Sequence, residues 1–200
     1  MDGIVLPAVL GANIDYRAED VLYDDHGIKI LNEFVITNKN GEQSVFMEVQ
    51  NSSDQNLYAA ATQAEVNGIL CSSAAGHEMI VAGKRGVMSI SLENMLGKNY
   101  MEKLDMKAYK NFKCYFGVED EGGNALGGKD IEIAFGGSVN PEDFASEMVY
   151  DANGFKIMNV GVVKDSSEYS DDLHLLLLVK NETNQVVDIS DSFYVFYNVV

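Results

Sequence analysis

The chain contains the same short pattern twice, and this internal repeat restricts the folds it can adopt more than any other feature. Residues 22–32 have the sequence LYDDHGIKILN, and residues 149–159 have the sequence VYDANGFKIMN. Further along, residues 49–55 (VQNSSDQ) return as residues 179–185 (VKNETNQ). Self-similarity over a long period is typical of tandem modules, which stack along a chain and usually bind, space or display something.

Alternation of apolar and polar residues dominates the sequence and predicts strands that are buried on one face. The Asn67-Gly68 pair is the strongest hairpin signal, and residues 92–96 are the one expected helical turn. Strand-sized runs occur at residues 28–30, 45–49, 57–66, 79–81, 87–92, 110–118 and 130–135. About seven or eight short strands without long helices predict an all-β fold of tandem immunoglobulin-like antiparallel β-sandwiches, the second incomplete.

The repeat divides the chain into three expected parts. Residues 1–16 are the terminal strand of a preceding module, residues 17–137 a complete sandwich, and residues 146–200 the first half of a second one. Half a sandwich cannot bury its apolar face or close its edges alone. We therefore expect residues 1–10 to help complete the second module, within the chain or from a neighbouring copy.

The net charge of −17 restricts the partners that this chain can have. Nucleic acid and anionic membrane surfaces both require clustered Lys and Arg, so neither is an expected partner. The sequence contains no apolar run of the roughly 18 residues that a membrane-spanning helix needs, so membrane insertion is not expected either. The remaining candidates are a protein or a glycan.

The cysteines and the N-terminus bear on the compartment. Cys71 and Cys114 show no metal-ligand spacing, and whether they pair is open, although a buried thiol is the more common state for a residue in an alternating run such as Cys114. Residues 1–4 lack the basic and apolar regions of a signal peptide. Either the protein is cytoplasmic or this is a piece of a longer exported one, and the incomplete second copy favours an extracellular or cell-surface location.

Several motifs together resemble a known repeat. They are the pattern Tyr-Asp-x-x-Gly-Ile/Phe-Lys-Ile, the sequence VQNSSD, and residues 66–68, 81–85, 92–96 and 112–120. In this combination the chain resembles the immunoglobulin-like repeat of uncharacterised secreted or surface proteins of Gram-positive gut bacteria, over residues 20–136 and in part over residues 148–200. The resemblance implies a β-sandwich and an exported setting, and the family carries no established catalytic residues.

Acidic residues at equivalent places in the two copies make calcium the only metal candidate. Asp24 and Asp25 correspond to a segment that contains Asp151 and Asn153. Ca²⁺ requires six to eight oxygen ligands, and the bidentate Glu that closes a calcium loop is missing at the proper spacing. A tight turn before a strand explains the same residues and is the favoured interpretation. The three histidines share no zinc spacing, and no other cofactor is expected.

No catalytic residues are predicted, and we expect the chain not to be an enzyme. Cys71, Ser72 and Ser73 lie near His77, but no nucleophile elbow or triad pattern surrounds them. Residues 82–86 lack the glycine and the helix of a phosphate loop.

Tyr100, Tyr109 and Tyr115 are the candidate ligand-binding residues, since flat aromatic rings can stack on sugars. The leading hypothesis is a non-enzymatic repeat module of an exported or cell-surface bacterial protein, acting in adhesion, binding or spacing. The alternatives are a carbohydrate-binding accessory module and a subunit that assembles by β-strand exchange between chains.

Overall fold

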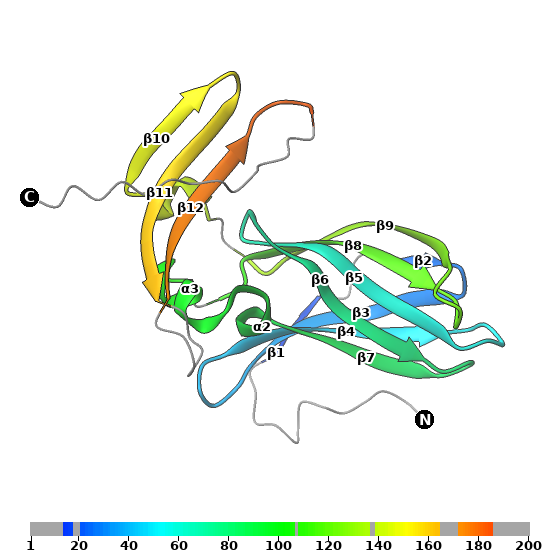
Figure 1. The fold of residues 1–200 in the computed structure, drawn as a ribbon. Coiled ribbons are helices and arrows are strands. Elements are labelled where there is room, and N and C mark those ends of the chain that lie inside the picture. The colour runs from blue at the N-terminus through cyan, green and yellow to red at the C-terminus, as the bar shows by residue number, and fades with distance from the viewer. Residues whose placement is uncertain (1–13, 18–20, 107, 137–138, 165–171, 186–200) are drawn as a thin grey trace, which may run out of the picture.

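Two antiparallel sheets pack face to face and form a β-sandwich from residues near the N-terminus to residue 134 (Figure 1). The computed structural model describes residues 14–17, 21–106, 108–136, 139–164 and 172–185. Within these residues the fold is all-β with short helices, which confirms the predicted class.

The sandwich has two four-strand ladders. The first contains, in order, β1 (Ile14–Arg17), β3 (Ile28–Thr37), β4 (Gln43–Asn51) and β7 (Arg85–Ser91), with the short β2 (Asp24–Asp25) also paired to β3. The second contains, in order, β6 (Ile69–Ile80), β5 (Leu57–Val66), β8 (Asn111–Glu119) and β9 (Ala125–Ala134).

Alternate residues of the facing strands form the core. Val45, Met47 and Val49 of β4 are fully buried, and so are Phe112 and Phe116 of β8. A strand side chain points to the opposite face from its neighbours, so one face of each sheet collects the apolar residues. Burial of each such side chain stabilises the fold by roughly 1.5–3 kcal/mol.

Local signals position the connections between the strands. Asn67 and Gly68 both have positive φ angles, of 52° and 83°, and join β5 to β6 in the predicted hairpin. The Ser91 hydroxyl accepts a hydrogen bond from the Asn94 N–H at 3.4 Å and caps α2 (Leu92–Leu96), the predicted helical turn. A second helix, α3 (Lys98–Lys103), was not predicted.

Two strands differ from the sequence-based expectation. The expected short strand at residues 79–81 is the end of β6, which begins ten residues earlier at Ile69. β1 pairs antiparallel with β3, with Ile14 opposite Ile36, so residues 14–17 extend the first sheet of the sandwich. Residues 1–13 lie outside the described residues, as do residues 186–200, and the expected role of residues 1–10 and the three-part division stay predictions.

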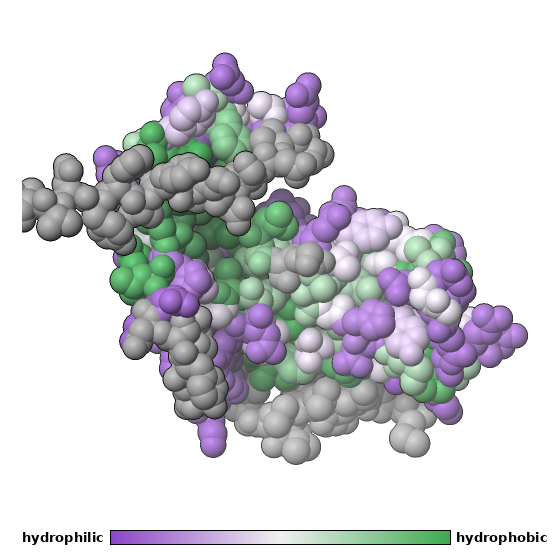
Figure 2. Space-filling model, viewed as in Figure 1, coloured by the Kyte–Doolittle hydropathy of each residue, from purple (hydrophilic) through white to green (hydrophobic). Residues whose placement is uncertain are grey.

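A third sheet follows the sandwich. After the 3₁₀ turn η1 (Pro141–Phe144), the strands β10 (Glu147–Ala152), β11 (Phe155–Lys164) and β12 (Leu173–Asn181) pair in this order. Val160 and Leu178 pack against the core of the sandwich, and Asn99 of α3 donates a hydrogen bond to the carbonyl of Lys164 at 2.6 Å. In Figure 2, hydrophobic surface gathers where this sheet meets the sandwich.

The two similar sequence segments form the same loop. The Ser53 N–H donates to Asn51 Oδ1 at 2.9 Å, and the Thr183 N–H donates to Asn181 Oδ1 at 2.9 Å. Asn51 and Asn181 each donate from Nδ2 to the carbonyl four residues later, at 2.8 Å in both loops. The sequence similarity therefore corresponds to a shared local structure at the ends of β4 and β12.

The pairing of the strands before these loops is also shared. Val45 of β4 lies opposite Val35 of β3, and the corresponding Leu175 of β12 lies opposite Val162 of β11. Val45 is fully buried and Val35 is 8% exposed, whereas Leu175 is 56% exposed and Val162 is 53% exposed. The second sheet facing β3 and β4 accounts for this difference.

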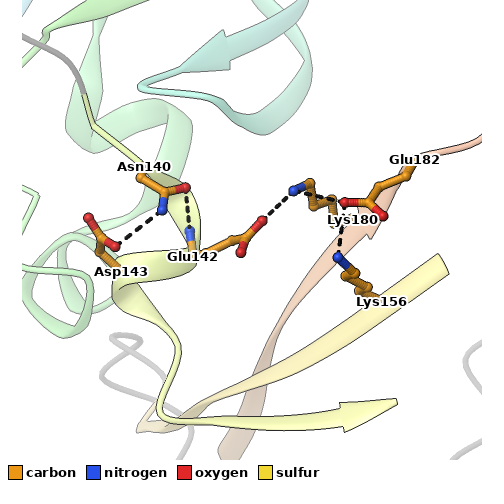
Figure 3. A network of polar contacts seen from close by, with 6 residues as sticks. All are labelled: Asn140, Glu142, Asp143, Lys156, Lys180 and Glu182. Atoms are coloured by element: carbon orange, nitrogen blue, oxygen red, sulfur yellow. Dashed lines mark hydrogen bonds and ion pairs between the residues drawn. The ribbon is translucent and has the colours of Figure 1, made fainter. Parts of the chain in front are cut away.

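The segment that joins the sandwich to the third sheet contacts both of them. A Cβ atom built at Gly68 would lie 2.8 Å from Pro141 Cγ, so Pro141 sits directly on the β5–β6 turn. On the other side, Lys180 Nζ donates to Glu142 and also to Glu182 at 3.0 Å (Figure 3). These hydrogen bonds raise the pKa of Lys180.

Candidate functional site

A groove of about 390 Å³ crosses β5, β8 and β9 on the face of the sheet that points away from the core. Its volume lies within the range of small-molecule sites. The lining residues come from all three strands, and we call this site the Tyr115 groove: Gln63, Glu65, Lys113, Cys114, Tyr115, Asp130, Ile131 and Glu132.

Strand register places the polar side chains of the groove in two neighbouring rows. Lys113 of β8 lies opposite Glu65 of β5 and Glu132 of β9. Tyr115 lies two residues further along β8, opposite Asp130. Residues two apart on a strand share a face, so both rows point to the same side of the sheet.

Glycine makes room for the Tyr115 ring. Tyr115 is 39% exposed. A Cβ built at Gly128 would lie 2.7 Å from the ring carbon Cζ, and one built at Gly117 would lie 3.4 Å from Cε1. A Cβ at Gly128 would therefore clash with the ring, whereas one at Gly117 would be in ordinary van der Waals contact with it.

A bulge in β5 shapes one side of the groove. The pairing of β5 with β8 shifts between Thr62 and Glu65, and Gln63 within this bulge has a φ of 52°. Positive φ is unfavourable for a residue with a side chain and costs roughly 1–2 kcal/mol. Bulges often re-aim a side chain next to a functional site, and here the bulge places the exposed Gln63 at the groove.

The groove carries more negative than positive charge. Lys113 Nζ lies 3.7 Å from Glu65 Oε1 and 3.7 Å from Glu132 Oε2. Asn111 of β8 donates a hydrogen bond to Glu132 and helps to orient it. Together with Asp130, three carboxylates thus face one ammonium group at this surface.

The structure separates the three predicted tyrosines. Tyr109 is a core residue, 3% exposed, whose hydroxyl donates to the carbonyl of Ile90 at 3.1 Å, and burial raises its pKa. Tyr100 is half-buried in α3. Tyr115 is the one of the three that faces outward on the sandwich. Sequence reasoning did not find its acidic neighbours Glu65, Asp130 and Glu132 because they come from other strands.

The four weak calcium candidates lie in two hairpins that each contain a tight turn. Asp24 forms an ion pair with Lys29 at 2.8 Å, and Asp25 accepts a hydrogen bond from the His26 N–H at 2.8 Å. Asp151 lies opposite Lys156, and Asn153 has a φ of 56° in the turn that follows. Among the described residues, no three His, Cys, Asp or Glu side chains converge on a point that a metal could occupy.

His77 and Cys71, which the sequence did not identify as catalytic, make contacts with other residues. The His77 ring stacks on Tyr58 with centroids 4.8 Å apart, and His77 Nε2 lies 3.6 Å from Glu119. The Cys71 thiol donates to the carbonyl of Ile69 at 3.0 Å. The side chains of Ser72 and Ser73 lie outside the described part of the structure.

Both cysteines are free thiols, and burial raises the pKa of Cys71 to about 11 and that of Cys114 to about 12. The thiolate is the form of cysteine that reacts with iodoacetamide. We therefore expect Cys114 to be alkylated very slowly at pH 8 in the native protein and rapidly once the protein is unfolded. A thiol pKa that is higher in the folded than in the unfolded protein contributes to stability below pH 9. This contribution to the free energy of unfolding is lost as the pH rises towards 12. Mass spectrometry after timed labelling measures the rates, with Cys114→Ala as the control. Native labelling at the rate of the unfolded chain would contradict the burial of Cys114.

In the part of the chain that the structure describes, no helix is long and apolar enough to cross a membrane. Comparison with protein-family models, with curated proteins and with solved structures gives no match for this chain.

Proposed function

We propose that this chain is a non-catalytic, immunoglobulin-like module of a tandem array in an exported or cell-surface bacterial protein, where it acts in adhesion, binding or spacing. The observation that carries the proposal is the loop formed twice, once around Asn51 and once around Asn181, with the same hydrogen bonds. The same strand–loop unit formed twice in one chain supports a modular organisation, in which similar structural units follow one another.

The strand order supports the immunoglobulin-like part of the proposal. Such domains place the first, second, fourth and fifth strands in one sheet and the third, sixth and seventh in the other. If β3 is taken as the first strand, β3-β4-β7 and β5-β8-β9 follow this arrangement. The fourth strand, β6, differs because it pairs with β5 at the edge of the other sheet. Tyr109 lies just before β8 begins, which is the place of the conserved tyrosine in the tyrosine corner of these domains. Its hydroxyl differs from that motif because it donates to the carbonyl of Ile90 in β7, 19 residues upstream.

A spacing role requires that neighbouring units keep a fixed orientation. Pro141 contacts the β5–β6 turn, and Glu142 is bonded to Lys180 of β12. Phe144 and Leu178 pack against the core of the sandwich. Polar and apolar contacts on both sides of η1 therefore support a rigid connection.

Nitrogen-15 NMR relaxation of the whole chain tests this connection. We expect the amides of β5 and β11 to report one common rotational correlation time. Lys180→Met should give β10–β12 faster local motion, because it breaks the bond to Glu142. Lys156→Met is the matched control, since Lys156 pairs with Glu182 at 3.1 Å and does not touch η1. Two different correlation times in the unaltered protein would contradict a spacing role.

Assembly between chains is the second candidate function. It is favoured by the apolar side chains of β12 that remain exposed: Leu173 is 70% exposed, Leu175 is 56% exposed and Val179 is 37% exposed. An exposed apolar strand is a ready site for addition of a strand from another chain. Light scattering after size-exclusion chromatography tests this function: a ladder of oligomers that grows with concentration supports it, and a monomer at all concentrations rejects it.

A further inference from the structure

We propose that the Tyr115 groove binds a neutral saccharide, whose pyranose ring stacks on Tyr115 while Gln63 and Asp130 hold its hydroxyl groups. This inference rests on the proposed function, because it assumes that the module binds a ligand and names the class of that ligand.

The stacking surface is already formed in the protein. The Tyr115 ring is 39% exposed and lies against Gly117 and Gly128, so these two positions place no side chain against it. The apolar face of a pyranose ring needs a flat, accessible aromatic surface of this kind. A ring that is held in place before binding also loses little conformational entropy when the ligand arrives.

Gln63 and Asp130 supply the polar contacts that a sugar requires. Neither side chain makes a hydrogen bond or ion pair with another residue in the described part of the chain, although both line the groove. A carboxylate accepts two hydrogen bonds, and an amide both donates and accepts. Together these two groups can therefore pair with adjacent hydroxyls, which act as donors and acceptors at once.

The backbone at Gln63 gives a second, independent indication. A left-handed conformation at a non-glycine residue is strained, and Gln63 has a φ of 52° inside the bulge where the pairing of β5 with β8 shifts register. Glycine would occupy this position without strain. The presence of a glutamine here is explained if its amide is used by a ligand.

The charge of the groove selects among saccharides. Among the described residues that line the groove, Glu65, Asp130 and Glu132 carry negative charge and Lys113 carries the one positive charge, and the whole chain has a net charge of −17. Sulfated and uronic-acid sugars are repelled by such a field, whereas neutral pyranosides are not. The ligand class is therefore a neutral saccharide.

NMR titration of the full chain with methyl β-glucoside, methyl β-galactoside, methyl α-mannoside and N-acetylglucosamine tests the proposal, at concentrations up to roughly 100 mM, well above a millimolar Kd. We expect at least one probe to give saturable shifts confined to the amides of residues 63–65, 113–115 and 130–132. Galacturonate at the same concentrations should give none.

Three variants make the test specific. Tyr115→Ala should weaken binding by about tenfold or more, because the stacking surface is lost. Tyr150→Ala removes a tyrosine on β10 that is similarly exposed, at 44%, and should leave binding unchanged. Gln63→Gly should weaken binding while keeping or raising the melting temperature, since it relieves the strained backbone.

Shifts that survive Tyr115→Ala, or the absence of shifts with all four neutral probes, would overturn the proposed site. Neither result contradicts the proposed module function, because that function is tested separately by the nitrogen-15 NMR relaxation of the amides of β5 and β11.

Discussion

Replacing Asn51 with alanine is expected to lower the free energy of unfolding by about 3 kcal/mol. The Asn51 side chain is fully buried and donates from Nδ2 to the carbonyls of Gln55 and Ile80, both at 2.8 Å. The bond to Ile80 joins the end of β4 in one sheet to the end of β6 in the other. Alanine leaves the buried carbonyl of Ile80 without this partner, which costs more than the loss of an exposed hydrogen bond. Urea unfolding followed by circular dichroism measures the change.

The repeat supplies the control for this substitution. Asn181 makes the same loop bonds, to Thr183 and Gln185, but its side chain is exposed. We therefore expect Asn181→Ala to cost less than about 1 kcal/mol. Equal losses for the two alanine variants would show that Asn51 does not connect the two sheets.

Phe116→Ala is expected to destabilise the protein by about 3–5 kcal/mol. Phe116 is fully buried and its ring centroid lies 4.9 Å from that of Tyr23, which is 2% exposed. Removal of the ring leaves a cavity between the two sheets that close packing does not allow the neighbours to fill. Thermal and urea unfolding report the loss.

The preceding residue on the same strand is the control. Tyr115→Ala should change the free energy of unfolding by less than about 1 kcal/mol, because its side chain lies on the outer face of β8. A large loss from Tyr115→Ala, or a small one from Phe116→Ala, would mean that β8 presents the opposite face to the core. The same pair shows that Tyr115→Ala is folded when it is used in the saccharide titration.

The sequence alone predicts much of the sandwich because its signals are local. In β8 the residues Phe112, Cys114, Phe116 and Val118 occupy every second position, and the structure buries all four. Asn67-Gly68 predicts its hairpin because few residue pairs adopt two positive φ angles readily. These features depend on neighbours along the chain and need no tertiary information.

The extent of β6 could not be predicted in the same way. Residues 71–76 have the sequence CSSAAG, and small residues carry weak strand preference. The strand exists because β5 provides a long antiparallel partner, from Leu57 opposite Ile80 to Val66 opposite Ile69. Helix α3 was missed for a related reason, since its six residues lack an N-terminal side-chain cap.

The candidate site depends on the register in which β5, β8 and β9 pair, and this register could not be predicted from the sequence. Lys113 and Tyr115 were visible as outward positions, but Glu65, Asp130 and Glu132 reach them only through the pairing of three strands. The signal available in the sequence was Gly127-Gly128 inside a strand, because glycine in a strand often marks the close approach of another group. The bulge at Gln63 had no sequence signal of its own.

The central claim is that the chain forms a two-sheet sandwich and then builds the opening strands of that sandwich again. Cross-strand nuclear Overhauser effects measure this directly. The claim predicts backbone contacts between Val35 and Val45 and between Ala61 and Phe116 in the sandwich, and between Val162 and Leu175 in the third sheet. Contacts that instead pair β12 with a strand other than β11, or a different register between β11 and β12, would contradict it.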